Sequence, residues 1–521
     1  MINEIYFLIP RSSGCYAMNQ NPNNSPKNNS IDGEVRLSRY SLLRNWLSII
    51  GLSVVGLSLF AFLLLFAIDH FAKFSNPYIG VLTYLVCPIL FMIGIGVAFI
   101  GALIERKRIS KAKSEGRTIL VIDLSKAADR KKMFFFLGLF LLFLVFITVG
   151  SYHGYHFTES TTFCGKVCHT VMKPEMVTYE HSPHARVSCT ECHIGPGASW
   201  FVKSKISGAY QVYATIANKY PRPIPTPIKN LRPAQETCEQ CHWPKKFVGN
   251  LDRTYNYYLM DETNTLFSIR MLLKVGGADP THGPVGGIHW HMNVGNKVEY
   301  IATDSNRLVI PWVRVTDQLG VVTEYRVKNF TNEISGYQIR TMDCMDCHNR
   351  PSHIYKSPND AVNLAMSLGK IDPAIPWIKS NAVYILTQEY RTETEGVQKI
   401  ATFLANTYSN YTNKMRIDMA ISAVQEIFTN NFFPEMKASW KVYPNHIGHK
   451  DWPGCFRCHD GKHKTSDGKK SVKANECNAC HIILAQGSGK ELENLNANGQ
   501  EFKHPGGDYD ISCVDCHSGG Y

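Results

Sequence analysis

The sequence predicts a membrane-anchored protein in which three N-terminal transmembrane α-helices precede a large outer module with little regular structure. Two observations carry this prediction. Three apolar runs cover approximately residues 46–69, 77–104 and 133–150, and each is long enough to cross a bilayer. Beyond them, fourteen of the sixteen cysteines stand in seven pairs, each followed directly by a histidine.

The net charge of +12 is concentrated beside the apolar runs. Residues 105–132 hold ten Lys/Arg against four Asp/Glu, and residues 1–45 hold five against three. A basic excess in this position reflects membrane topology and gives no reason to expect nucleic-acid binding. The positive-inside rule places the N-terminus and the loop 105–132 in the cytoplasm, and everything after residue 150 on the opposite side.

Six cysteine pairs fit the pattern Cys-x-x-Cys-His, and the first pair has three residues between its cysteines. In c-type haem attachment, two such thiols add to the haem vinyl groups and the adjacent histidine ligates the iron. Zinc sites also use cysteine pairs, but they do not require a histidine after each one. We therefore predict seven covalently bound haem c groups, attached at Cys164, Cys168, Cys189, Cys192, Cys238, Cys241, Cys344, Cys347, Cys455, Cys458, Cys477, Cys480, Cys513 and Cys516. The proximal iron ligands are His169, His193, His242, His348, His459, His481 and His517.

A low-spin haem needs a second axial ligand, and ten histidines near or between the haem sites lie outside the motifs. Their pairing with particular haems stays open, because five extended residues span up to about 17 Å and His353 could reach its own haem or a neighbouring one. Met172 and Met176 follow the first motif and are either thioether ligands or packing residues. The candidate distal ligands are Met172, His184, His289, His291, His353, His446, His449, His463 and His504.

The spacing of motifs and periodic segments also predicts the domain organisation. Stretches of alternating polarity at 297–304 and 321–328 predict a β-rich insertion, and the apolar spacing over 415–433 predicts helices. The expected parts are a disordered N-terminus (1–45), the transmembrane helices (46–150), haem sites one to three (151–250), a β-rich subdomain (251–340), the fourth haem site (341–359), a helical segment (360–437) and a three-haem region (438–521).

The motifs resemble those of the NapC/NirT/NrfH family of membrane-bound quinol dehydrogenase cytochromes. The resemblance rests on the segment 164–172, on Ser182-Pro183-His184 before the second motif, and on the segment 344–353. It implies a bacterial inner-membrane protein that oxidises menaquinol or ubiquinol beside the first haem, as in anaerobic or extracellular metal respiration. Lys203 and Lys205 stand at about the position of a quinol-site lysine in such proteins. The chain departs from the family in having three expected spans instead of one and a longer first motif.

Three functions stay open from the sequence. The favoured one is a quinol:cytochrome c oxidoreductase, and the alternatives are a passive membrane-anchored electron relay and a reductase of nitrite or hydroxylamine. Residues 133–521 carry a charge of +4. Fourteen haem propionates would shift this charge to about −10, which favours periplasmic c-type cytochromes with a basic docking face as electron acceptors. The sequence does not define the oligomeric state.

Overall fold

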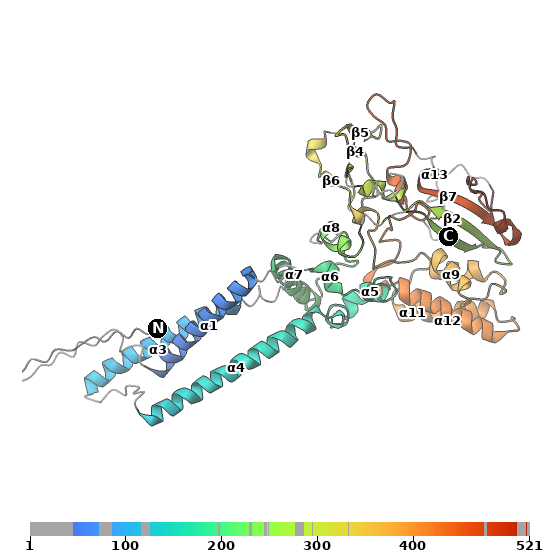
Figure 1. The fold of residues 1–521 in the computed structure, drawn as a ribbon. Helices are drawn as coiled ribbons and strands as arrows, with labels where there is room; N and C mark the ends of the chain where they lie inside the picture. The colour runs from blue at the N-terminus through green and yellow to red at the C-terminus, as the bar shows by residue number, and fades with distance from the viewer. Residues whose placement is uncertain are drawn as a thin grey trace, which may run out of the picture. The chain divides into compact units, whose positions relative to one another are not determined.

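In the computed structural model, the described part of the chain comprises residues 45–71, 86–115, 126–167, 169–195, 198–228, 232–243, 247, 249–276, 286–293, 295–331, 333–473, 477–507 and 517. Apart from Asn45, the expected disordered segment 1–45 lies outside these residues. The chain divides into two units, Met1–Phe60 with Pro88–Leu137 and Ala61–Cys87 with Gly138–Tyr521 (Figure 1).

Three helices of the described residues are long and apolar enough to cross a membrane, which confirms the predicted transmembrane helices. They are α1 (Trp46–Phe71), α3 (Cys87–Glu115) and α4 (Ala127–Glu159). The most apolar stretch of α4 contains no buried residue. This exposure of apolar side chains is expected of a helix whose surroundings are lipid.

In the first unit, α1 and α3 pack closely through small residues. The Ser48 hydroxyl donates a hydrogen bond to the Ala98 carbonyl (3.1 Å), and the Asn45 side-chain amide donates to the Gly101 carbonyl (3.1 Å). A Cβ on Gly51 would lie 2.4 Å from the Ala98 backbone nitrogen. Small residues and interhelical hydrogen bonds of this kind associate helices in lipid, where there is no hydrophobic driving force between them.

The second unit contains two antiparallel sheets. The first has the order β1 (Leu251–Tyr258), β2 (Leu266–Leu273) and β7 (His481–Gly487), so a strand from the C-terminal region pairs with the inserted hairpin. The second has the order β5 (Val322–Arg326), β4 (Trp312–Thr316), β3 (Lys297–Ile301) and β6 (Arg340–Thr341). Trp312 and Ile301 on adjacent strands are fully buried and anchor this second sheet.

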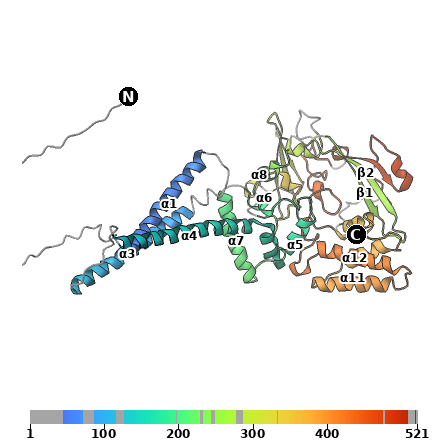
Figure 2. The same ribbon diagram turned by 60° about the horizontal axis from the view of Figure 1, so that its bottom comes forward.

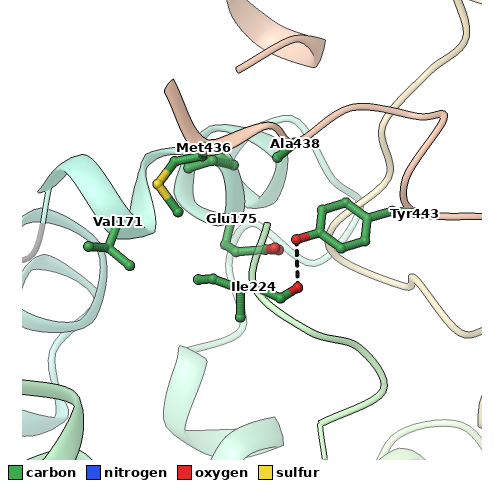
Figure 3. Close-up of a pocket in the computed structure, with 7 residues that line it drawn as sticks. Val171, Glu175, Ile224, Met436, Ala438 and Tyr443 are labelled. Carbon is green, nitrogen blue, oxygen red and sulfur yellow. Dashed lines mark hydrogen bonds between the residues drawn. The ribbon is translucent and has the colours of Figure 1, made fainter. Parts of the chain in front are cut away.

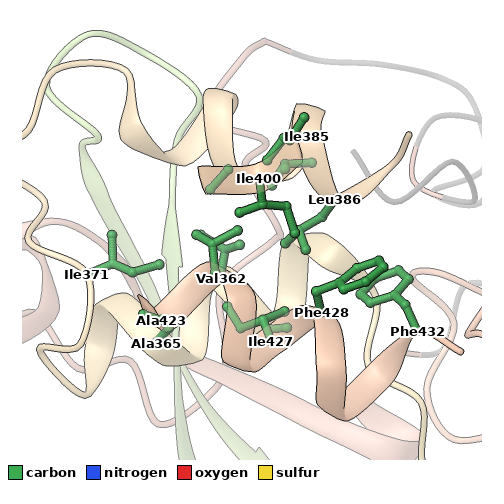
Figure 4. Close-up of a cluster of buried hydrophobic side chains, with 14 of the residues drawn as sticks. Val362, Ala365, Ile371, Ile385, Leu386, Ile400, Ala423, Ile427, Phe428 and Phe432 are labelled. Carbon is green, nitrogen blue, oxygen red and sulfur yellow. The ribbon is translucent and has the colours of Figure 1, made fainter. Parts of the chain in front are cut away.

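Four helices supply the largest apolar core: α9 (Pro358–Ser367), α10 (Ile378–Leu386), α11 (Glu393–Thr407) and α12 (Lys414–Asn431). The sequence defines three of their starts, because Ser357, Thr392 and Asn413 accept hydrogen bonds from the first-turn amides of α9, α11 and α12. Fully buried side chains from all four helices meet between them, as Figure 4 shows: Val362, Leu386, Ile400 and Phe428.

Candidate functional site

Each cysteine motif within the described residues forms one short helical turn. In three motifs the histidine amide donates to the carbonyl of the first cysteine, as from His242 to Cys238 (2.8 Å), from His348 to Cys344 (2.8 Å) and from His459 to Cys455 (3.0 Å). Residues three and four positions apart on a helical turn share one face. The turn therefore presents both thiols and the imidazole on the same side, as covalent haem attachment requires.

The first motif has one residue more and adopts a different turn. Residues Phe163–Val167 form a π-helical turn, η3, which holds more residues than an α-helical turn. This turn accommodates the three-residue spacing between Cys164 and Cys168. Cys168 and the side chain of His169 lie outside the described residues, as do the side chain of Cys477, Cys513 and Cys516.

Six motif histidines each lie beside a second histidine from elsewhere in the chain. Two imidazoles on opposite sides of one iron, with metal–nitrogen distances of about 2 Å, have ring centroids roughly 6–6.5 Å apart. The observed centroid distances match: His184 to His242 (6.0 Å), His193 to His353 (6.4 Å), His289 to His348 (6.4 Å), His291 to His459 (5.9 Å), His449 to His481 (6.2 Å) and His504 to His517 (6.3 Å). The residues present therefore fit six haem irons, each between two imidazoles.

The hydrogen bonds of the histidines that lie outside the motifs support this interpretation. Metal-binding histidines usually donate the remaining ring N–H to a carbonyl or carboxylate, which fixes the ring and leaves the other nitrogen for the metal. Four of them do so through Nδ1: His184 to Pro351 (3.1 Å), His289 to Val275 (2.5 Å), His291 to Ile288 (2.9 Å) and His353 to Glu175 (3.0 Å).

The burial of the paired imidazole rings also supports their assignment as metal ligands. Desolvation lowers the pKa of both rings in several pairs and so favours the neutral imidazole, which is the form that ligates a metal. The rings with a lowered pKa are His193, His291, His348, His353, His449, His459 and His481.

Glu175 lies directly behind His353. Its carboxylate Oε2 is 3.1 Å from His353 Nδ1, and its Oε1 accepts a hydrogen bond from the Tyr355 hydroxyl (3.1 Å). Figure 3 shows the surroundings of Glu175, where the Tyr443 hydroxyl donates to the Ile224 carbonyl (2.8 Å) and the lining side chains leave no room for a ligand. The carboxylate is thus held close to a candidate iron ligand in a packed, poorly solvated region.

Two of the candidate histidine ligands stand outside the pairs. His446 is buried, and its Nδ1 and Nε2 lie 3.1 and 3.0 Å from the carbonyl oxygens of Asp346 and Asn306. His463 is also buried, with Nδ1 2.8 Å from the Asp460 carboxylate and Nε2 2.7 Å from the Ile310 carbonyl. Because both nitrogens of each ring already have polar partners, we leave these two residues out of the proposed ligand set.

The two methionines after the first motif differ in their surroundings. Met176 packs on the π-helical turn, and a Cβ on Gly165 would lie 2.3 Å from the Met176 sulfur. Met172 is half-buried one helical turn earlier in α5 (His169–Glu180). Met176 therefore has a packing role, while Met172 stays a candidate ligand of the first haem.

The cysteines of successive motifs adjoin one another. The Cys164 thiol is hydrogen-bonded to that of Cys189, and the Cys238 thiol to that of Cys344. The Cys192 thiol is also close enough to Cys241 for the charge of Cys241 to raise its pKa, although burial has the larger effect. The first four motifs therefore follow one another in space in the order in which they occur in the chain.

Lys205 lies beside the first motif in an ion pair that the sequence did not predict. Its Nζ is 2.7 Å from Oε1 of Glu159, the last residue of α4, and it also donates to the Thr158 hydroxyl (3.2 Å). The charges of Glu159 and Lys205 both act on the Cys164 thiol, whose pKa is raised chiefly by its hydrogen bond with Cys189. An acidic residue at the very end of a membrane-spanning helix is the signal that could have identified this pair.

Lys203 takes no part in that pair. It lies on α7 (Ala198–Ile216), where its Nζ is 4.8 Å from the centroid of the Trp200 ring. The histidines at the end of α4 are close to aromatic rings, with His156 4.4 Å from the Tyr152 ring centroid. Of the two predicted lysines, the structure brings only Lys205 to the first motif.

Three membrane-spanning helices followed by cysteine pairs and matched histidine pairs define a membrane-anchored multihaem c-type cytochrome. The model of the NapC/NirT cytochrome c family, N-terminal region, matches residues 126–223. The cytochrome c-type protein ImcH of Geobacter sulfurreducens is 42% identical over 491 residues, which cover 91% of this chain and 95% of the relative. The chain therefore belongs to the NapC/NirT cytochrome c family, as its motifs indicated. No solved structure matches it.

Proposed function

We propose that the protein is a membrane-bound menaquinol or quinol dehydrogenase that delivers electrons through seven c-type haem sites to periplasmic c-type cytochromes. The observation that carries this proposal is the Glu159–Lys205 ion pair, which joins the end of α4 to α7 beside the first motif. The pair follows the apolar stretch of α4, and we place it at the membrane surface, where the headgroup of a quinol dissolved in the bilayer arrives. Haem c, when bound, supplies the one-electron redox chemistry.

The ion pair provides the proton chemistry that quinol oxidation needs, because oxidation of a quinol releases two protons along with two electrons. The Glu159 carboxylate is only 14% exposed and is held 2.7 Å from the Lys205 ammonium. A carboxylate can accept a proton from a quinol hydroxyl. Lys205 is held in place by the Thr158 hydroxyl and lies 5.9 Å from the centroid of the Tyr155 ring. In this proposal Glu159 is a proton acceptor, and Lys205 holds its carboxylate in position.

The arrangement of the motifs supports onward transfer. The first four motifs adjoin in chain order, and the histidine pairs provide the later sites with two imidazoles each. Bis-imidazole sites leave no open position for a substrate, which favours electron transfer over reduction of nitrite or hydroxylamine. We further propose that the N-terminus is cytoplasmic and the haem-bearing unit periplasmic in a bacterial inner membrane, on the basis of the basic loop 105–132.

The test compares haem reduction by a menaquinol analogue with reduction by dithionite in the purified full-length protein. Lys205→Met and Glu159→Gln are expected to slow reduction by quinol at least tenfold while leaving dithionite reduction and haem content unchanged. Lys203→Met is the matched control, since Lys203 is two residues away on the same helix and outside the ion pair. If the wild-type protein is reduced by dithionite but by no quinol, the protein is a passive relay and the proposal is wrong.

A further inference from the structure

Helix α7 (Ala198–Ile216) exposes its apolar side chains. Val202, Ile206, Tyr210, Tyr213 and Ile216 recur every three or four residues and form one continuous face, which we call the α7 stripe. All five are exposed, with Ile206 at 69% and Ile216 at 82%. A stripe at helical spacing normally faces the core of a water-soluble domain, so its exposure needs a partner.

The opposite face of α7 is partly buried against the protein, although Gln211 on that face is exposed. Ala214 is buried there, and Ser204, Ser207 and Gly208 are half-buried. Small and polar residues therefore face inward while large apolar residues face outward. In a water-soluble domain the large apolar residues would face inward. The reversed arrangement in α7 indicates that the surroundings on the outer side of the helix are more apolar than water.

The position of α7 identifies those surroundings. Lys205 ties α7 to Glu159 at the end of α4 (2.7 Å), and Figure 2 shows α7 crossing α4 near that end. The apolar stretch of α4 closes at Val149 and is followed by Tyr152 and other aromatic and polar residues, a composition typical of the lipid–water interface. Helix α7 is therefore at headgroup level, beside a segment that spans the membrane.

The residues flanking the stripe are of the types expected at the headgroup level of a membrane. Lys203 and Lys219 are both exposed, and Trp200 and Tyr213 lie beneath their ammonium groups at 4.8 and 5.5 Å from ring centroid to Nζ. Lysines beside an apolar face, together with tyrosine and tryptophan, are the composition of helices that lie in a membrane interface. In such an interface, lipid phosphates would supply counter-charges for the lysines, and acyl chains would cover the stripe.

We propose that α7 is an interfacial helix whose stripe is buried in the bilayer surface, forming a second attachment of the haem-bearing unit to the membrane. This attachment fixes the depth of Lys205, which projects from α7 beside the stripe. A consequence that rests on the proposed function is that the Glu159–Lys205 pair is held where the quinol headgroup arrives. The attachment itself does not depend on quinol oxidation.

The test is photo-crosslinking of the full-length haem-loaded protein in nanodiscs of phosphatidylethanolamine and phosphatidylglycerol. A benzoylphenylalanine at position 206 or 216 is expected to form several-fold more lipid adducts, detected by mass spectrometry, than one at position 211. Gln211 is the matched control because it is exposed on the same helix but lies on the face opposite the stripe.

Equal lipid adducts at positions 206, 216 and 211 would overturn the proposal. So would crosslinks from the stripe to a second copy of the chain, to another protein or to a haem group, since each identifies a different occupant. None of these crosslinking measurements uses a quinol. An inactive dehydrogenase with lipid adducts confined to the stripe would therefore refute the proposed function and leave the interfacial helix standing.

Discussion

The imidazole rings of His193 and His353 lie with their centroids 6.4 Å apart, and Glu175 stands behind His353. The two histidines belong to different motif regions, since His193 closes the second motif and His353 follows the fourth. A haem attached at Cys189 and Cys192 would therefore take its second imidazole from a residue that follows the fourth motif. Ligation across motifs links the positions of neighbouring haems to the fold of the whole unit.

Replacing His353 by alanine is expected to convert one haem from low-spin to high-spin, because the second motif loses its distal imidazole. Electron paramagnetic resonance of the oxidised protein measures this directly. His463→Gln is the control, since the ring of His463 is buried but hydrogen-bonded to Asp460 and Ile310. A low-spin spectrum unchanged by His353→Ala would show that His353 is not a ligand.

Replacing Glu175 by glutamine is expected to raise the midpoint potential of the haem at the second motif. The carboxylate 3.1 Å from His353 Nδ1 increases the electron-donating character of that ligand and stabilises the oxidised iron. A spectroscopic redox titration should show one component moved to higher potential and the others in place. An equal shift of all components, or none, would contradict a local effect of Glu175.

The denatured chain is expected to carry seven haem groups by mass spectrometry, because all seven cysteine pairs have the attachment spacing or the π-helical turn that accommodates it. A Cys189→Ala, Cys192→Ala double variant should carry one fewer. A wild-type mass with six groups would mean that the long first motif is empty. In that case the Glu159–Lys205 pair could not serve a haem beside it.

The membrane helices and the attachment motifs could be predicted from the sequence because each depends on a short segment. Apolar length defines α1, α3 and α4, and one helical turn defines the geometry of a Cys-x-x-Cys-His motif. The distal ligands could be proposed only as a set. Which histidine faces which motif depends on long-range packing, as in the approach of His184 to His242.

Two features could not be predicted from the sequence, for physical reasons. The third span was expected to end at residue 150, but α4 continues to Glu159 because Tyr152, Tyr155 and Phe157 are compatible with a helix beyond the hydrocarbon. The acidic end of the helix was therefore missed. The pairing of β2 with β7 joins segments that are distant in the sequence, and alternation within a strand does not reveal its partner.

Lys379 provides a test of the helical core by pH. It is fully buried in α10, where its Nζ donates to the carbonyl oxygen of Asn359 (2.8 Å) and to the side chain of Asn363 (2.9 Å). Burial lowers its pKa from 10.5 to about 7, an effect that the nearby Asp360 carboxylate partly opposes. Between these two pH values the unfolded chain binds a proton that the folded chain does not. The free energy of unfolding therefore rises with pH, by up to about 1.4 kcal/mol per pH unit from this group.

Lys379→Met removes this contribution, so the stability of the variant relative to the wild type is expected to fall as the pH increases from 7 to 10. The measurement is the apparent Tm of both proteins in detergent across this range, taken as a difference so that other titrating groups cancel. Lys370→Met is the control, because Lys370 is exposed and pairs with Glu426 on the surface (2.7 Å). A Tm difference for Lys379→Met that does not change with pH would show that Lys379 keeps its ordinary pKa in the folded protein, and that the core around α10 admits enough water to solvate its charge.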